Sequence, residues 1–166
     1  MSRTALFAGS FDPITVGHED IIRRALPLFD HITVAIGNNV RKNTLFDLDT
    51  RRRWVETTFA DCPTVSADIY SCATIDYCIE QGIRYLIRGI RNPNDLVYEQ
   101  EIALLNRRLA PEVETVFLLT APQHSDVSSS AVREFVTFGK DASELVPAAI
   151  RNDFSHIVKN LKNKEL

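Results

Sequence analysis

The chain has 166 residues, of which 45% are hydrophobic and 25% are charged. This length and hydrophobic content suit a sizeable core, and we expect residues 1–166 to form a single domain. A net charge of −3 and the lack of any basic run argue against a surface built for duplex nucleic acid. No apolar run reaches the roughly 18 residues of a membrane span, and the first residues lead directly into a predicted strand, so we expect no membrane span, no signal peptide and a cytoplasmic location.

The cysteines are three in number, Cys62, Cys72 and Cys78, and no two of them have Cys-x-x-Cys spacing. An odd count without that spacing argues against both a disulfide framework and a zinc site. We therefore expect small buried thiols in a reducing compartment.

Short apolar runs alternate with helical patterns along the chain. Strands are predicted at residues 4–8, 31–36, 64–67, 85–87 and 113–119, and helices at residues 17–26, 48–59, 74–80 and 95–109. This alternation indicates right-handed crossovers, and hence a five-stranded parallel sheet with helices on both faces, a Rossmann-like α/β fold. Two further helices, at about residues 130–138 and 147–161, are expected to pack on the same domain.

Three details of the helices follow from the sequence. Pro27 should end or kink the first helix near Leu26, because proline breaks a helix interior. The helix at 95–109 carries one apolar stripe that we predict to be core. The stripe consists of Tyr98, Ile102, Leu105 and Leu109. In the helix at 48–59, Arg51, Arg52 and Arg53 are expected to form a solvated face.

Residues 9–18, Gly-Ser-Phe-Asp-Pro-Ile-Thr-Val-Gly-His, lie between the first strand and the first helix. Small residues at a helix N-terminus favour an anion, although neither a Walker sequence nor GxGxxG is present. Gly17 allows a ligand to approach the backbone, and the ring of His18, on the face that packs on the sheet, can donate to a phosphoryl oxygen. The alternative is an ordinary helix start with a partly buried histidine.

Three other strand ends also carry donors suited to phosphate: the loop 37–43 with Lys42, the Arg-Gly-Ile-Arg segment 88–91, and the segment 124–130 with three serines. The carboxyl ends of parallel strands meet at one edge of a sheet, so these loops are expected to form one pocket. Each has a structural alternative: Lys42 as surface charge, 88–91 as a solvated turn, and 128–130 as a plain helix cap.

Charge patterns near these loops favour a bound anion. Arg88 closes an apolar run, where a buried guanidinium requires a partner, and a ligand is one candidate. The helix at 130–138 has no acid before Glu134, so its positive N-terminus is poorly neutralised from within. Asp95 and Glu99 lie four residues apart near a helix start. They either complement the helix dipole, or Glu99 accepts from a ribose hydroxyl or orients Arg91.

Together these motifs resemble bacterial phosphopantetheine adenylyltransferases, members of the nucleotidylyltransferase superfamily with T/HxGH and SSSxxR motifs. The resemblance extends over nearly the whole chain, in the same order. It rests on residues 9–18, Lys42, Arg-Gly-Ile-Arg at 88–91, Asp95, Tyr98 with Glu99, and Val-Ser-Ser-Ser-x-x-Arg at 127–133. Any one motif alone would indicate only the superfamily.

The resemblance implies reversible transfer of the adenylyl group from ATP to 4′-phosphopantetheine, which gives dephospho-coenzyme A and pyrophosphate in coenzyme A biosynthesis. The substrate phosphate attacks the α-phosphorus in line, so no covalent enzyme intermediate forms. The resemblance further implies Mg²⁺ carried with ATP and no metal ligand from the protein. The implied assembly is a homohexamer, with no nucleic-acid or membrane partner.

Residue roles follow from the resemblance as well. It makes His18 the transition-state stabiliser, with Lys42 and Arg91 as further catalytic residues. The implied substrate-binding residues are Ser10, Lys42, Thr74 and Arg88. The implied nucleotide-binding residues are Ser10, Phe11, His18, Gly89, Ile90, Arg91, Glu99, His124, Ser125, Asp126, Val127, Ser128, Ser129 and Ser130. Several cations are needed because two polyanions must be held together against their repulsion, and His18 is expected to be one of them.

The sequence departs from the family pattern at three places. Ser10 replaces a frequent threonine and keeps the hydroxyl. Thr74 stands where the family has a large apolar residue along the pantetheine arm, and residues 124–127, His-Ser-Asp-Val, stand where the family has an aromatic residue followed by Ser-Phe-Ile. The contacts to adenine and to the pantetheine arm are therefore expected to differ in detail.

Two other functions remain open. One is another adenylyltransferase of the superfamily, for example one acting on nicotinate mononucleotide, although Arg88 with Lys42 favours an acceptor that ends in phosphate. The other is a non-catalytic nucleotide sensor. His18 argues against the sensor, because a protein that only binds needs no transition-state donor.

Overall fold

The computed structural model describes residues 2–38 and 43–162. Its strands are β1 (Thr4–Gly9), β2 (His31–Gly37), β3 (Val65–Tyr70), β4 (Tyr85–Ile90) and β5 (Glu114–Leu119). They form one parallel sheet in the order β3-β2-β1-β4-β5. The helices are α1 (Val16–Ala25), α2 (Leu48–Thr58), α3 (Thr74–Glu80), α4 (Pro93–Leu109), α5 (Ser129–Thr137) and α6 (Arg151–Lys162). The predicted Rossmann-like α/β fold is thus confirmed.

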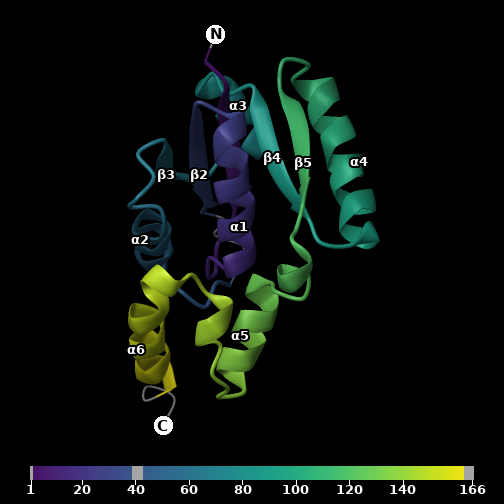
Figure 1. Ribbon diagram of the computed structural model, residues 1–166. Coiled ribbons are helices and arrows are strands. Elements are labelled where there is room, and N and C mark those ends of the chain that lie inside the picture. Colours follow the sequence, from purple (N-terminus) through teal and green to yellow (C-terminus); the bar gives the residue numbers. More distant parts are fainter. Residues whose placement is uncertain (1, 39–42, 163–166) are drawn as a thin grey trace.

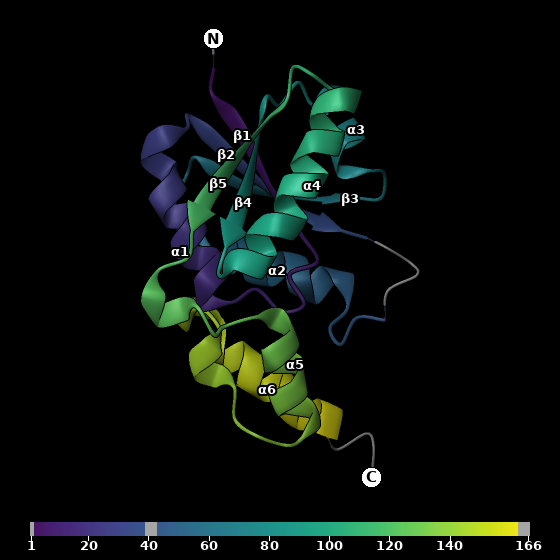
Figure 2. The ribbon, with the colours of Figure 1, turned by 90° about the vertical axis from the view of Figure 1, so that its right-hand side faces the viewer.

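Helices cover both faces of the sheet, α1 and α2 on one and α3 and α4 on the other (Figures 1 and 2). Side chains alternate along β1, so Ala5 and Phe7 join the core under α1 and α2, whereas Leu6 and Ala8 join the core under α3. All four side chains are at most 6% exposed, so β1 is shielded from solvent on both faces. This burial on both faces explains why β1 is apolar throughout.

The last two helices lie beyond the carboxyl ends of the strands (Figure 1). There α6 packs on α2: the rings of Phe154 and Trp54 are 5.8 Å apart, and the Trp54 indole N–H donates to Asp153 at 2.7 Å. The two helices α5 and α6 thus lie together on the side of the molecule that faces the carboxyl ends of the strands.

β4 is longer than predicted. The strand continues through residues 88–90, which pair with Phe117, Leu118 and Leu119 of β5. The structural alternative of a solvated turn at 88–91 is therefore wrong for residues 88–90. Local sequence favours a turn, but the neighbouring strand supplies hydrogen bonds that keep the chain extended.

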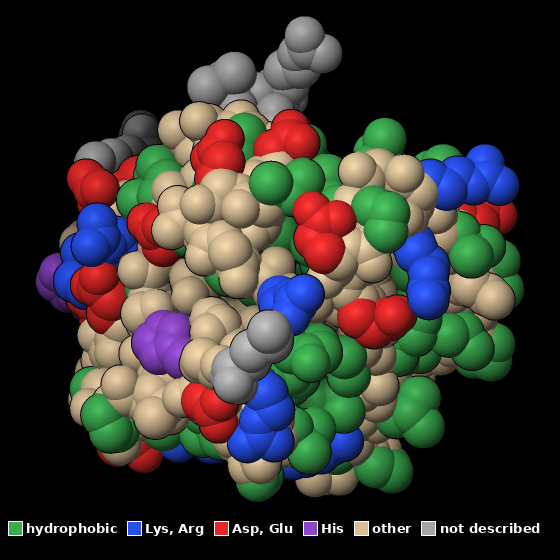
Figure 3. Space-filling view, turned by 90° about the horizontal axis from the view of Figure 1, so that it is seen from above, with side chains coloured by type: hydrophobic (Ala, Val, Ile, Leu, Met, Phe, Trp, Pro, Cys, Tyr) green, Lys and Arg blue, Asp and Glu red, His purple; other side chains and the backbone are tan. Residues whose placement is uncertain are grey.

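The apolar stripe of α4 was predicted to be part of the core, but it is exposed. No residue of α4 is buried, and Tyr98, Leu105 and Leu109 are 63%, 53% and 72% exposed. In a view down onto the amino ends of the strands, hydrophobic side chains gather on the side where α4 lies (Figure 3). Helical spacing predicts an apolar face but gives no information on what covers it.

Two smaller expectations also need correction. Arg51 is only 3% exposed, because it lies on the same side of α2 as the buried Trp54 and Val55, three and four residues further on. Three consecutive helical residues cannot share one face. Cys62 and Cys78 are buried as expected, but Cys72 is exposed.

The prediction that the first helix ends near Leu26, before Pro27, is confirmed. α1 ends at Ala25, and a single 3₁₀ turn, Leu26–Leu28, carries the proline in its first positions. Within residues 2–38 and 43–162, no helix has the length and apolar content that a membrane span requires.

Candidate active site

A cavity of about 410 Å³ opens at the carboxyl ends of β1 and β4, facing the N-terminus of α5. Many of the predicted site residues line it: Ser10, Phe11, His18, Arg88, Gly89, Arg91, Glu99, Val127, Ser128, Ser129 and Ser130. Residues far apart in sequence thus meet here, as the parallel sheet predicts.

Other predicted site residues lie outside the lining of this cavity. Ile90 is buried, and Ser125 and Asp126 are exposed. His124 lies beside the first helix, since a Cβ added at Gly17 would come within 3.8 Å of its Cβ. The hydroxyl of Thr74 lies 2.8 Å from that of Tyr70, near the end of β3. Lys42 is outside the described residues.

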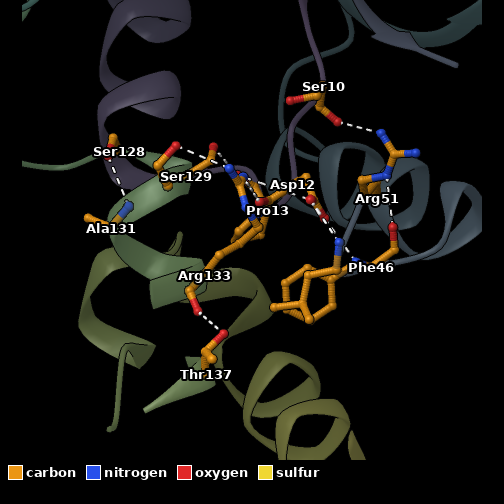
Figure 4. Close-up of polar contacts among 12 residues, drawn as sticks. Ser10, Asp12, Pro13, Phe46, Arg51, Ser128, Ser129, Ala131, Arg133 and Thr137 are labelled. Carbon is orange, nitrogen blue, oxygen red and sulfur yellow. Dashed lines mark hydrogen bonds and ion pairs between the residues drawn. The ribbon is translucent and has the colours of Figure 1, made fainter. Parts of the chain in front are cut away.

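The loop after β1 is held by its backbone (Figure 4). From α2, Arg51 Nη1 donates to the Ser10 carbonyl at 2.7 Å. From α5, Arg133 Nη1 donates to the Asp12 carbonyl at 2.7 Å, and Ser129 Oγ donates to the Pro13 carbonyl at 2.8 Å. The two helices therefore fix the loop between them at the mouth of the cavity.

The carboxylate of Asp12 is a structural anchor of the same loop. It is 2% exposed, and its two oxygens accept the backbone N–H groups of Leu45 and Phe46, both at 2.9 Å (Figure 4). Its Oδ2 lies 3.7 Å from Arg133 Nη1. Asp12 thus ties the loop to the segment that enters α2.

Thr15 orients the imidazole of His18. The Thr15 hydroxyl accepts the His18 backbone N–H at 3.4 Å, and the Thr15 backbone N–H donates to His18 Nδ1 at 3.1 Å. This is a capping box in which histidine takes the place of the usual glutamate or glutamine. Because Nδ1 accepts, the proton of the neutral ring lies on Nε2. His18 therefore offers an Nε2–H donor to a ligand in the cavity.

His18 is uncharged at neutral pH in the ligand-free protein. Burial, together with the nearby cations Arg91 and Arg88, lowers the pKa of His18 from 6.5 to about 4. In the ligand-free protein His18 is therefore a neutral hydrogen-bond donor rather than one of the cations of the site.

Two arginines of the cavity are paired with carboxylates of α4. Arg88 donates from Nε and Nη2 to Glu99, at 2.7 and 2.5 Å, and from Nη1 to the Ala8 carbonyl at 2.9 Å. Arg91 donates from Nε and Nη2 to Asp95, at 2.9 and 3.4 Å. The partner that Arg88 requires is therefore Glu99 of the same chain, and Glu99 orients Arg88 rather than Arg91.

The N-terminus of α5 faces the same cavity. Ser128 is its cap, with Oγ accepting the Ala131 N–H at 3.1 Å, and its first turn contains no acid. Ser129 and Ser130 line the cavity. The positive end of the helix dipole is thus available to an anion, together with the hydroxyls of Ser128 and Ser130, whereas the Ser129 hydroxyl already donates to the Pro13 carbonyl.

Sequence reasoning missed two contributors to this site, Thr15 and the buried Arg51. The threonine had a signal, because Thr15 and His18 have capping-box spacing. Arg51 had none, since only the folded chain shows that two backbone carbonyls surround it. Arg133, which the sequence shows only as part of a motif, holds the loop after β1.

The arrangement suits the binding of phosphates rather than covalent catalysis. Three guanidinium groups, those of Arg88, Arg91 and Arg133, line one cavity together with a neutral imidazole donor, and the N-terminus of α5 faces it. The hydroxyl of Thr15 is hydrogen-bonded to His18, but it is buried and caps α1, so it is not placed as a nucleophile. Among residues 2–38 and 43–162, no cluster of three or more His, Cys, Asp or Glu side chains is arranged to hold a metal ion.

The chain belongs to the cytidylyltransferase-like family, which it matches over residues 6–135. A phosphopantetheine adenylyltransferase from Flavobacterium psychrophilum is 50% identical over 149 residues, which cover 90% of this chain and 98% of that protein. A second one, from Rubrobacter xylanophilus, is 49% identical over 146 residues, with coverage of 88% and 89%. Within the family, the chain is thus a member of the phosphopantetheine adenylyltransferases, as the sequence motifs indicated.

A solved structure shows the same fold at low identity. It is a bifunctional NMN adenylyltransferase/ADP ribose pyrophosphatase from Francisella tularensis, with a TM-score of 0.73 and 14% identity. The likeness covers 96% of this chain and 50% of that one. At this identity it supports the fold alone.

Proposed function

We propose that this protein transfers the adenylyl group of ATP reversibly to 4′-phosphopantetheine, giving dephospho-coenzyme A and pyrophosphate. The observation that carries the proposal is the cavity itself, where donors suited to phosphate converge from the ends of β1, β4 and β5. Membership of the phosphopantetheine adenylyltransferases supports the choice of acceptor. The reaction is a step of coenzyme A biosynthesis, for which we expect a cytoplasmic location.

In the proposed reaction, an oxygen of the acceptor phosphate attacks the α-phosphorus of ATP in line. The new bond joins this oxygen to the α-phosphorus, and the bond from the α-phosphorus to the bridging oxygen breaks, so pyrophosphate leaves with the electron pair. No protein nucleophile takes part. Catalysis then consists of positioning two polyanions and stabilising the charge that develops on the phosphoryl oxygens.

The ATP phosphates are assigned to Arg91, the Nε2–H of His18 and the N-terminus of α5 with Ser129 and Ser130. His18 stabilises the transition state, because a fixed donor costs no reorganisation when charge develops. The rest of the nucleotide is assigned to Phe11, Gly89, Ile90 and residues 124–128. The acceptor is assigned to Ser10, Arg88, Thr74 and Lys42, the last of which lies outside the described residues.

Mg²⁺ is expected to enter with ATP and to neutralise part of the phosphate charge. Two carboxylates line the cavity, Asp95 and Glu99, and each is already bound to an arginine. These side chains therefore suit a metal held by phosphate oxygens and water better than one held by the protein.

The proposed assembly is a homohexamer. Its support is the exposed apolar face of α4, formed by Tyr98, Ile102, Leu105 and Leu109. Such a contiguous apolar surface is typical of contacts between protein molecules.

The direct test is an assay of pyrophosphate release with ATP and each of two acceptors, 4′-phosphopantetheine and nicotinate mononucleotide. We expect turnover with 4′-phosphopantetheine alone. Turnover only with the mononucleotide would show that the proposed acceptor is wrong, but it would still support adenylyl transfer. ATP binding without turnover on either acceptor would favour a nucleotide sensor.

A further inference from the structure

Phe11, in the loop after β1, has a backbone conformation that is rare for its residue type. Its φ is 45°, in the left-handed region that is unfavourable for a residue with a Cβ. Such a conformation persists where the surrounding structure holds it, and it is found most often at functional sites. On one side of Phe11, Arg51 donates to the Ser10 carbonyl at 2.7 Å. On the other side, Arg133 donates to the Asp12 carbonyl at 2.7 Å.

The ring of Phe11 packs beside the imidazole of His18. Phe11 is 2% exposed, and its ring centroid lies 5.2 Å from that of His18 and 5.8 Å from that of Phe7. The Phe7 ring in turn lies 6.0 Å from the imidazole. Gly9 leaves room for this packing, because a Cβ there would come within 3.3 Å of the Phe11 ring. Two aromatic rings therefore border the imidazole at the cavity wall.

These contacts add to the hydrogen bond that His18 receives from its own helix. The Thr15 N–H holds one atom of the imidazole, Nδ1, but a single hydrogen bond does not fix the plane of a ring. The two neighbouring rings are inclined to the imidazole by 66° and 70°, an edge-to-face arrangement that aromatic rings favour. Packing of this kind restricts a side chain to one rotamer. The direction of the Nε2–H is then set before a ligand enters.

The same rings surround the imidazole with apolar atoms. An apolar surrounding disfavours the charged form of histidine, because the imidazolium loses more hydration than the neutral ring. Burial is the largest cause of the lowered pKa of His18, ahead of the charges of Arg91 and Arg88. The rings of Phe11 and Phe7 contribute to this burial.

We propose that Phe11 is a positioning residue of the adenylyl transfer reaction. Its ring holds the plane of the His18 imidazole and shields the imidazole from water, so that the Nε2–H is a fixed donor toward the cavity. Phe11 acts through His18, and its ring does not bind the nucleotide. This inference rests on the proposed function and deepens it, because it gives the Phe11 ring a task at His18 in place of a contact with ATP.

The test compares Phe11→Leu with the matched control Phe154→Leu. Both phenylalanines are 2% exposed, and each has two aromatic neighbours with ring centroids within 5.8 Å. Phe154 lies on α6 and is not part of the cavity lining. The measurements are the pKa of His18 by NMR in the ligand-free protein, kcat with 4′-phosphopantetheine as the acceptor, the Kd of a non-hydrolysable ATP analogue, and the Tm. Phe11→Ala makes the same change more strongly.

The pKa of His18 reports this packing because the charged groups around the imidazole stay the same in each variant. Among the described residues, β4 and the residue after it, α4, and α5 supply the charged side chains of the cavity lining. These are Arg88, Arg91, Asp95, Glu99 and Arg133. The hydrogen bond to Nδ1 comes from the backbone of Thr15, which the substitutions leave in place.

We expect Phe11→Leu to raise the pKa of His18 from about 4 by about 1, toward the ordinary 6.5, because water reaches the ring. It should lower kcat about tenfold and leave the Kd of the ATP analogue within about twofold, because a loosely held donor is lost mainly in the transition state. Phe11→Ala should enlarge both effects. Phe154→Leu should lower the Tm but leave the pKa of His18 and kcat as in the wild type.

A lowered Tm in Phe11→Leu with unchanged kcat and unchanged His18 pKa would show that Phe11 is only a core residue, and would overturn the inference. A rise in the Kd of the ATP analogue that matches the loss in kcat would overturn it too, because the ring would then bind the nucleotide. So would a raised pKa without any loss in kcat, since shielding would have no effect on the reaction. If the wild type fails to use 4′-phosphopantetheine, the proposed function fails, but the NMR titration still tests whether Phe11 shields His18.

Discussion

His18 lies among cations at a site proposed to bind an anion, yet its own ring carries no charge at neutral pH. Burial and the neighbouring arginines keep its ring neutral, and the Thr15 N–H fixes the proton on Nε2. In the proposed reaction, a neutral donor would contribute little to the ground-state attraction for ATP, which is assigned to Arg91 and the N-terminus of α5. It can still shorten its hydrogen bond when charge accumulates on a phosphoryl oxygen, which is how a residue raises kcat more than affinity.

His18→Ala should therefore lower kcat by about 10²- to 10³-fold, while the Kd of ATP changes by less than roughly tenfold. The reason is that the lost hydrogen bond matters most in the transition state. Steady-state kinetics and calorimetry on the same preparation give both numbers. Equal losses in kcat and affinity would contradict a transition-state role.

The ionisation of His18 can be measured directly. In the ligand-free protein, NMR titration of the imidazole should give a pKa of about 4, well below the usual 6.5. The folded chain then binds fewer protons than the unfolded chain between these values, so the free energy of unfolding should fall as the pH drops from 6.5 towards 4. His18→Gln should flatten this part of the pH dependence. A measured pKa near 6.5 would mean that the ring is hydrated.

Arg51 is a residue whose importance is structural. It donates to the carbonyls of Ser10 and Phe46, and Arg51→Met would leave both without a partner. We expect a loss of about 3 kcal/mol in the free energy of unfolding, measured by denaturant titration. Arg52→Met is the control, because its solvent-exposed pair with Glu56 should contribute little to stability. Similar losses in both variants would contradict this account.

Among the elements, α5 has two tasks that depend on each other. Its N-terminus faces the cavity, and its Arg133 and Ser129 hold the loop that carries Ser10 and Phe11. Arg133 also donates to Ser130 Oγ at 3.1 Å, so one side chain ties the helix start to the loop. Any shift of α5 would displace both halves of the site together.

Arg133→Met should accordingly lower kcat/KM about 10²-fold, because small misplacements of reacting groups are costly. Arg52→Met again serves as control. We expect the Tm to fall by only a few degrees, since Arg133 is partly exposed and Ser129 still holds the loop. Unchanged kcat/KM would show that the loop keeps its position without the arginine.

At the scale of the whole molecule, the apolar face of α4 predicts self-association. Leu105→Glu would place a charge in the centre of this exposed face and should shift the protein from hexamers to smaller species in analytical ultracentrifugation. Leu28→Glu, at a separate exposed leucine, should leave the assembly unchanged. A wild-type protein that sediments as a monomer would contradict the proposed assembly.

The sheet and the meeting of its loops were predictable, because alternating strands and helices leave few topologies and parallel strand ends share one edge. The pairing of arginines with carboxylates inside the site was not predictable. Sequence spacing placed Glu99 near Arg91, but β4 extends through residue 90 and directs the Arg88 guanidinium to Glu99. The burial of Arg51 and the exposure of the α4 stripe also depend on tertiary neighbours, which periodicity does not reveal.

The carboxylate partners of Arg88 and Arg91 have a consequence for the encounter with nucleotide. Seen from a distance, each arginine and its acid form a dipole rather than a net charge, and the chain as a whole is negative. The field of the described residues therefore does little to draw ATP in from bulk solvent. A divalent cation that enters with the nucleotide, as proposed, would lower the long-range repulsion between the nucleotide and the negative chain by cancelling part of the phosphate charge.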